Sequence, residues 1–191
     1  MLTYRMLTEE NWEDFHTLFS KHKGVRGGCW CSFYLAYAGE YSKMDRAARY
    51  RHHKSTLEKA GPTGILLYEE DAPVAWVQVG KGDVLKRLNR NRKYKRLDRP
   101  TPETLWRIAC VFVDKGRRKE GLAKKAILMA LDHIKKHGGG LIEVAPFDFE
   151  KGDPRRFHHN GSKAFYEELG FMEVARIGKN EVLMEKRISA A

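Results

Sequence analysis

The chain has 191 residues, of which 42% are hydrophobic and 32% charged, and its formal net charge at pH 7 is +11. This length and hydrophobic content predict one folded domain over residues 1–191. No run of 18 apolar residues occurs and the first ten residues lack a signal-peptide core, which predicts neither a membrane-spanning helix nor export. Three cysteines cannot all pair, so we expect thiols in a reducing compartment and a cytoplasmic location.

The first third of the chain predicts a strand followed by two helices. Residues 2–7 are expected to form the strand, and Thr8 is the expected cap of a helix that carries aromatic residues at helical spacing. A basic, polar helix is expected over 45–59, and Gly61 and Pro62 end it.

The middle of the chain predicts a hairpin and then a basic segment. Residues 64–68 and 74–79 are expected strands joined by an acidic turn. Segment 81–99 holds nine Lys or Arg residues against two Asp residues. Such a run could contact RNA phosphates, but Tyr94 is its single aromatic residue, so it offers little for base stacking. We expect a solvated loop over the site, with nucleic acid an unlikely partner.

The last half predicts alternating strands and helices. In order, the expected elements are a strand at 104–113, a helix at 121–137, a strand at 141–145, a short helix that begins at Asn160 or Ser162, and strands at 171–177 and 181–187. The whole order predicts an α/β domain whose mixed sheet carries helices on its faces.

The strongest motif lies between a predicted strand and a predicted helix. From Val113 to Ala123 it reads Val-Asp-Lys-Gly-Arg-Arg-Lys-Glu-Gly-Leu-Ala. N–H groups at a helix start lack intrahelical partners and carry the positive end of the helix dipole, which favours an anion. Gly121 would let a pyrophosphate approach the backbone, and Arg118, Lys119 and Lys124 add charge. The alternative is a plain basic loop that caps a helix.

Two stretches of this sequence resemble signatures of the GNAT family of N-acetyltransferases. Arg118-x-x-Gly121-x-Ala123 resembles the family's pyrophosphate signature, and residues 165–171 resemble its Leu-Tyr-x-x-x-Gly-Phe motif. The resemblance implies a mostly antiparallel sheet with splayed central strands and helices on both faces, and acetyl transfer from acetyl-CoA to an amine. The cluster from Gly28 to Cys31 resembles a Gly-Cys-Trp-Cys cluster of one bacterial subgroup.

The resemblance also implies which residues hold acetyl-CoA, the cosubstrate. They are the backbone of Val111 and Val113, the loop residues Arg118, Lys119, Gly121, Leu122, Ala123 and Lys124, and Asn160, which lies close to the family's asparagine position. Tyr166 matches the family tyrosine near the thioester sulfur, and its implied role is the general acid that protonates the CoA thiolate. The alternative for Tyr166 is packing alone.

A general base is expected because an alkylamine must lose a proton before it attacks. Glu143 is the single acid within the strand at 141–145, and a buried carboxylate needs either a function or a partner. We therefore predict Glu143 as the base, with an ion pair to Arg107 as the alternative. Asp148, His158 and Glu103 are weaker candidates.

Trp30, Phe33 and Tyr34 are expected to line the acceptor pocket, with packing in the core as the alternative. Cys29 and Cys31 lack the Cys-x-x-Cys spacing of zinc sites, so no metal is expected.

The expected acceptor is a small-molecule amine that attacks directly in a ternary complex. A protein or peptide N-acetyltransferase, and a non-catalytic nucleic-acid-binding or regulatory protein with the same fold, are the alternatives. The sequence leaves the oligomeric state open, a homodimer included.

Overall fold

Seven strands form one mixed sheet in this computed structural model, which describes residues 1–100, 102–148 and 159–191. In chain order the strands are β1 (Leu2–Met6), β2 (Ile65–Glu69), β3 (Ala72–Lys81), β4 (Leu105–Val113), β5 (Gly140–Val144), β6 (Met172–Arg176) and β7 (Val182–Ile188). The sheet order is β1-β2-β3-β4-β5-β7-β6, and every described pairing is antiparallel except that of β4 with β5. This topology confirms the predicted mixed, mostly antiparallel sheet.

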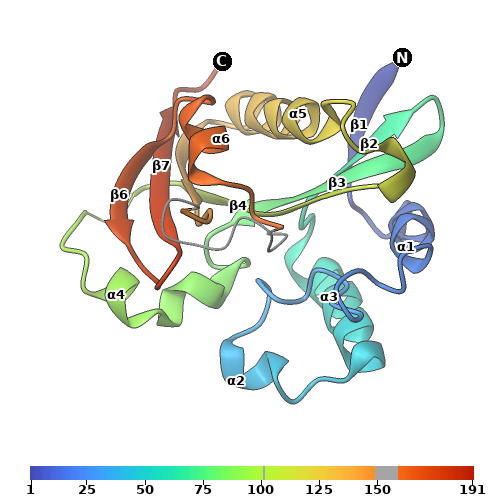
Figure 1. Ribbon diagram of the computed structural model, residues 1–191, viewed down its shortest axis with the longest axis horizontal. Coiled ribbons are helices and arrows are strands. Elements are labelled where there is room, and N and C mark those ends of the chain that lie inside the picture. Colours follow the sequence, from blue (N-terminus) through green and yellow to red (C-terminus); the bar gives the residue numbers. More distant parts are fainter. Residues whose placement is uncertain (101, 149–158) are drawn as a thin grey trace.

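Helices cover both faces of the sheet (Figure 1). The helices are α1 (Trp12–Ser20), α2 (Ala38–Tyr41), α3 (Arg46–Ala60), α4 (Arg92–Lys95), α5 (Leu122–Lys136) and α6 (Lys163–Glu167), with 3₁₀ turns η1 (Lys86–Arg90) and η2 (Lys115–Arg117). Helices α5 and α6 lie on one face, and α1 and α3 lie on the other. None of the described helices has the length and apolar content needed to cross a bilayer.

The central strands carry apolar side chains on both faces because an apolar core lies on each face of the sheet. Strands buried on both faces read as continuous apolar runs, and β2 is such a run. Successive side chains of a strand point to opposite faces. Leu67 belongs to the same apolar core as Ile127 of α5, whereas its neighbour Leu66 belongs to the core that contains Phe15 of α1.

Helix ends follow local capping chemistry. The side chain of Asp45 accepts a hydrogen bond from the Ala48 N–H (2.7 Å) at the start of α3, and Gly61 ends this helix with a φ of 78°. The prediction of Thr8 as the cap of α1 is wrong. Helix α1 begins after Asn11, whose carboxamide oxygen accepts from the Thr8 N–H at 2.7 Å, so Thr8 lies ahead of the helix.

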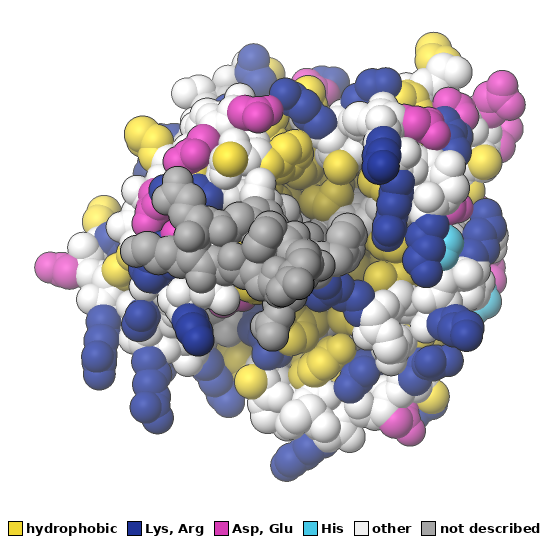
Figure 2. All heavy atoms as spheres, viewed as in Figure 1, with side chains coloured by type: hydrophobic (Ala, Val, Ile, Leu, Met, Phe, Trp, Pro, Cys, Tyr) yellow, Lys and Arg dark blue, Asp and Glu magenta, His cyan; other side chains and the backbone are white. Residues whose placement is uncertain are grey.

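The basic segment 81–99 is more ordered than predicted. Instead of a solvated loop it forms η1 and α4, and its apolar side chains pack against residues around β5 and β7. Leu88, Tyr94 and Leu97 supply these contacts. Six of its nine cations are exposed, whereas Lys86, Arg87 and Arg99 are half-buried. Figure 2 shows Lys and Arg side chains gathered along the edge where α4 lies.

Candidate functional site

The site starts where β4 and β5 separate. The two strands pair in parallel only from Leu105 to Arg107, opposite Leu141 to Glu143. In β4 the register shifts against β3, so that Cys110 pairs with Gln78 and Ile108 with Val79, which leaves Ala109 as a bulge. A bulge bends its strand, and here it accompanies the predicted splay.

Residues 159 and 160 bridge the two strands after they part. The Val111 N–H donates to the His159 carbonyl at 2.8 Å, and the Asn160 side-chain amide donates to the Ala145 carbonyl. The N–H of Val113 points to the same side as that of Val111, because alternate N–H groups of a strand face opposite neighbours. Of the two predicted backbone contacts of the cofactor, the Val113 N–H thus faces the splay, and the Val111 N–H is bonded to His159.

The predicted anion loop forms a tight turn into α5. The Asp114 carboxylate accepts from the Gly116 N–H at 3.1 Å, and Lys119 and Gly121 take left-handed conformations with φ of 70° and 74°. Arg117 forms ion pairs with Glu120 of the loop (2.8 Å) and with Glu69 at the end of β2 (2.6 Å).

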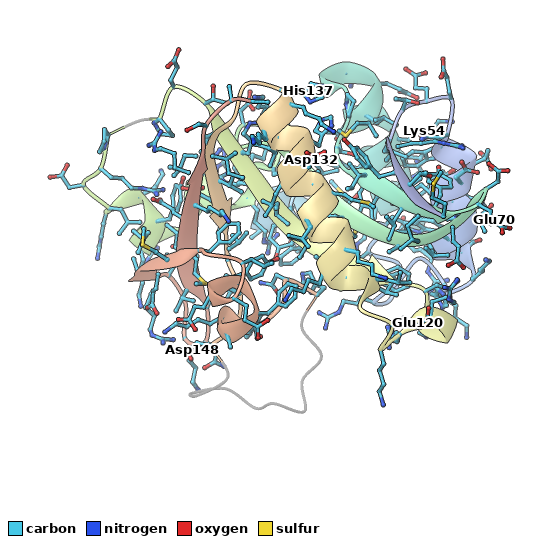
Figure 3. All side chains as sticks on the ribbon, turned by 90° about the horizontal axis from the view of Figure 1, so that it is seen from above. Lys54, Glu70, Glu120, Asp132, His137 and Asp148 are labelled. Atoms are coloured by element: carbon cyan, nitrogen blue, oxygen red, sulfur yellow. The ribbon has the colours of Figure 1, made fainter. Side chains whose placement is uncertain are left out.

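The N-terminus of α5 is open to an anion. The helix is 15 residues long and has no acidic residue in its first turn, and its first N–H groups have no intrahelical partner. A side-chain carbon built at Gly121 would meet nothing within 4 Å. Lys119 and Lys124 are exposed beside this turn, and Figure 3 shows α5 running across the sheet from its N-terminal end near Glu120 to His137. Leu122 is buried beneath the loop and supports it from the core.

Two buried polar atoms face the splay without a partner in the described part of the chain. The Tyr166 hydroxyl is fully buried on α6, and the Asn160 carboxamide oxygen is buried at the strand end. Burial raises the pKa of Tyr166 well above its usual value, so the hydroxyl keeps its proton. Buried polar groups are almost always hydrogen-bonded. The Tyr166 hydroxyl and the Asn160 carboxamide oxygen therefore fit a ligand that carries polar atoms into the splay, as the acyl end of acetyl-CoA would.

Glu143 is fully engaged by its neighbours. One carboxylate oxygen accepts from Arg107 at 2.8 Å, the other accepts from Arg99, and the Tyr94 hydroxyl lies 2.9 Å and 3.1 Å from the two oxygens. Glu143 as the base stays a prediction, but this arrangement favours the alternative, because both carboxylate oxygens already accept hydrogen bonds from Arg107, Arg99 or Tyr94. The ion pair with Arg107, the alternative given by the sequence, is present.

The three predicted pocket aromatics lie in two places. Phe33 and Tyr34 line a cavity of about 300 Å³ beside Ala145 at the end of β5. Trp30 instead packs into the core on the α1 face, where its ring lies 6.1 Å from that of Phe19. Trp30 thus lies where the alternative of packing in the core places it, apart from Phe33 and Tyr34.

The other candidates also separate. Asp148 is buried and paired with Arg176, and Glu103 is exposed on the surface. His158 lies outside the described residues. Its neighbour His159 stands beside the cavity, with its ring 5.7 Å from that of Tyr34.

Most residues of this cavity were not found from the sequence, and two of them are both charged and half-buried. Glu181, directly before β7, and Arg87, on η1, line the same cavity as Phe33 and Tyr34. Burial raises the pKa of Glu181 and lowers the pKa of Arg87. The one sequence signal was an acidic residue at the start of the strand expected at 181–187.

Comparisons with known proteins agree with this geometry. The sequence matches the profile of the acetyltransferase (GNAT) family over residues 30–171, and it matches no curated protein. A solved Pyrococcus horikoshii protein is 19% identical over 98% of both chains, with a TM-score of 0.55.

Two enzymes are similar in fold. PaiA N-acetyltransferase from Thermoplasma acidophilum, solved with coenzyme A, is 14% identical over 98% of this chain and 99% of that one (TM-score 0.53). Ribosomal-protein-S18-alanine N-acetyltransferase from Escherichia coli is 15% identical over 100% and 96% (TM-score 0.54).

Proposed function

The chain belongs to the acetyltransferase (GNAT) family, and from this premise we propose that it transfers acetyl from acetyl-CoA to the amine of a small molecule. The observation that carries the proposal is the buried hydroxyl of Tyr166, which has no hydrogen-bond partner among the described residues and lies at the splay between β4 and β5. We propose further that residues 1–191 act as one domain.

The cosubstrate would lie along the splay, from the start of α5 to Tyr166. Its pyrophosphate would accept hydrogen bonds from backbone N–H groups around Gly121 and Ala123, with Lys119 and Lys124 screening its charge. The pantetheine arm would follow Val113. Bound there, acetyl-CoA supplies an electrophilic carbonyl carbon and a thiolate leaving group.

The chain's own groups then move two protons. As the amine nitrogen bonds to the carbonyl carbon and the carbon–sulfur bond breaks, the Tyr166 hydroxyl donates its proton to the departing thiolate. The amine gives up one proton to a base, and a proton from solvent restores the Tyr166 hydroxyl. Burial raises the pKa of the Cys29 and Cys31 thiols, which makes both poor nucleophiles and favours direct attack over an acyl-enzyme route.

The cavity favours a small acceptor over a polypeptide. Its volume of about 300 Å³ suits a compact molecule. The net charge of +11 also slows the encounter with a polycationic tail.

The test is release of CoA thiol from acetyl-CoA with a panel of small amines and a panel of peptides. We expect release with small amines. Release with peptides alone would favour the protein N-acetyltransferase. Salt-dependent RNA binding with no thiol release by any amine would favour the non-catalytic alternative.

A further inference from the structure

Glu181 and Arg87 line one cavity and come from distant parts of the chain. Glu181 lies directly before β7, and Arg87 belongs to η1 in the basic segment. The same cavity is also lined by Ala145, which follows β5, and by Tyr34, which follows the Gly-Cys-Trp-Cys cluster. The cavity therefore forms only when these separate parts of the chain fold together.

Tyr34 connects this cavity to the predicted chemistry. Its phenol lies close enough to Glu181 and Tyr166 for both groups to act on it electrostatically. The Ala145 carbonyl, at the other wall, is held by Asn160 in the splay. An amine in the cavity would thus lie next to the position expected for the thioester.

Glu181 is a half-buried carboxylate with no counter-ion among the described residues. Its side chain has no hydrogen bond and no cation within ion-pair distance among the described residues, although Arg87 acts on it from further away. Burying an unpaired carboxylate is costly, and the raised pKa of Glu181 reflects that cost. An ammonium group bound in the cavity would supply the missing charge.

Arg87 is the complementary case. Its guanidinium stacks on the Phe33 ring at 3.4 Å from the centroid, and one N–H donates to the Phe33 carbonyl at 3.3 Å. No carboxylate of the described chain lies within ion-pair distance of it. A guanidinium has five N–H donors in a planar fork that matches a carboxylate. Stacking fixes this plane and leaves donors for a ligand.

On the basis of the proposed function, we propose that this cavity takes an α-amino acid or a similarly compact zwitterion, whose carboxylate binds Arg87 and whose amino group faces Glu181. The positive Arg87 and the negative Glu181 both line the cavity without forming an ion pair with each other. They therefore match a ligand that carries a carboxylate and an ammonium group. Glu181 would also accept the proton that the ammonium group must lose before its nitrogen attacks the acetyl carbon. Arg90, exposed at the rim, repels cationic ligands.

The test compares each amino acid with the amine that lacks its carboxylate, such as phenylalanine with phenethylamine, in the thiol-release assay. We expect kcat/KM to be about 10- to 100-fold higher for the amino acid, the range of one charge-assisted hydrogen-bonded pair. Arg87→Met should abolish this preference, Arg87→Lys should restore part of it, and the matched control Arg92→Met on exposed α4 should leave it unchanged. Glu181→Gln should lower kcat/KM for every amine.

Binding supplies a readout that is independent of turnover. With desulfo-CoA present, amino acids should raise the Tm of the parent protein and not that of Arg87→Met, provided that the variant without ligand melts as the parent does. Equal or better use of decarboxylated or phosphate-bearing amines would overturn the inference and leave the proposed function standing. If no amine releases thiol, the proposed function fails, and if amino acids also give no thermal shift, the inference fails with it.

Discussion

Replacing Tyr166 with Phe separates a catalytic hydroxyl from a structural one. The Tyr166 hydroxyl is fully buried and has no partner among the described residues. An unsatisfied buried hydroxyl costs about 1–3 kcal/mol. Its removal should therefore leave the free energy of unfolding unchanged or raise it by up to that amount. For a chain of this size, each kcal/mol shifts Tm by about 2–4 °C.

Turnover should change in the opposite direction. If the hydroxyl protonates the CoA thiolate, Tyr166→Phe should lower kcat by about 10²–10⁴-fold while acetyl-CoA still stabilises the protein. Thermal unfolding with and without acetyl-CoA, together with steady-state thiol release, measures both effects.

Tyr94→Phe is the matched control. The Tyr94 hydroxyl donates to Glu143 at 2.9 Å and accepts from Arg107 at 2.8 Å. Its loss should cost about 1.5–3 kcal/mol, the range for hydrogen bonds to charged groups. A Tyr166→Phe protein that is less stable than the parent, or one that turns over at the parent rate, would refute the reasoning about Tyr166.

Three further perturbations test other parts of the structure. Gly121→Glu should abolish the rise in Tm caused by acetyl-CoA, whereas Gly138→Glu, which carries the same positive-φ strain in open space at the other end of α5, should keep it; equal responses would contradict the loop assignment. Trp30→Ala should lower the free energy of unfolding by about 3–5 kcal/mol, as expected for a core aromatic, and any protein that stays folded should keep the parent KM for its acceptor; a selective rise in KM would return Trp30 to the pocket. Burial lowers the pKa of His53 to about 4, so below pH 6.5 the unfolded chain binds more protons than the folded protein, and the free energy of unfolding should fall by up to about 1.4 kcal/mol per pH unit between pH 6.5 and 4. His53→Gln should flatten this slope in acid titrations of stability, and an unchanged slope would assign the acid sensitivity to other groups.

The local elements were predictable because their signals are local. The helix over Arg46–Ala60 lies between a capping Asp45 and a terminating Gly61, and both neighbours are visible in the sequence. Strand β4 and helix α5 follow from side-chain periodicity, and the loop between them follows from its glycine and charge pattern.

The hydrogen bonds of Glu143 could not be predicted, because they depend on tertiary contacts that no local sequence pattern indicates. The burial of Glu143 follows from its place in the strand at 140–144. Its contacts with Arg99 and Tyr94 form only because the basic segment folds next to β5. That segment lacks periodicity, so the sequence indicated a solvated loop there.

The separation of Trp30 from Phe33 has a backbone cause. Trp30 and Cys31 adopt left-handed conformations with φ of 49° and 52°, which are uncommon for residues other than glycine. This turn sends Trp30 toward α1 and Phe33 toward the cavity. Glu181 and Arg87 escaped prediction for a related reason, because they come together only through the tertiary fold.

The most direct test of the central claim is the structure of this protein bound to CoA. We expect the pyrophosphate over the N-terminus of α5 beside Gly121, the sulfur within hydrogen-bond reach of the Tyr166 hydroxyl, and the Val111 N–H released from His159. CoA bound elsewhere, or with its sulfur remote from Tyr166, would contradict the account.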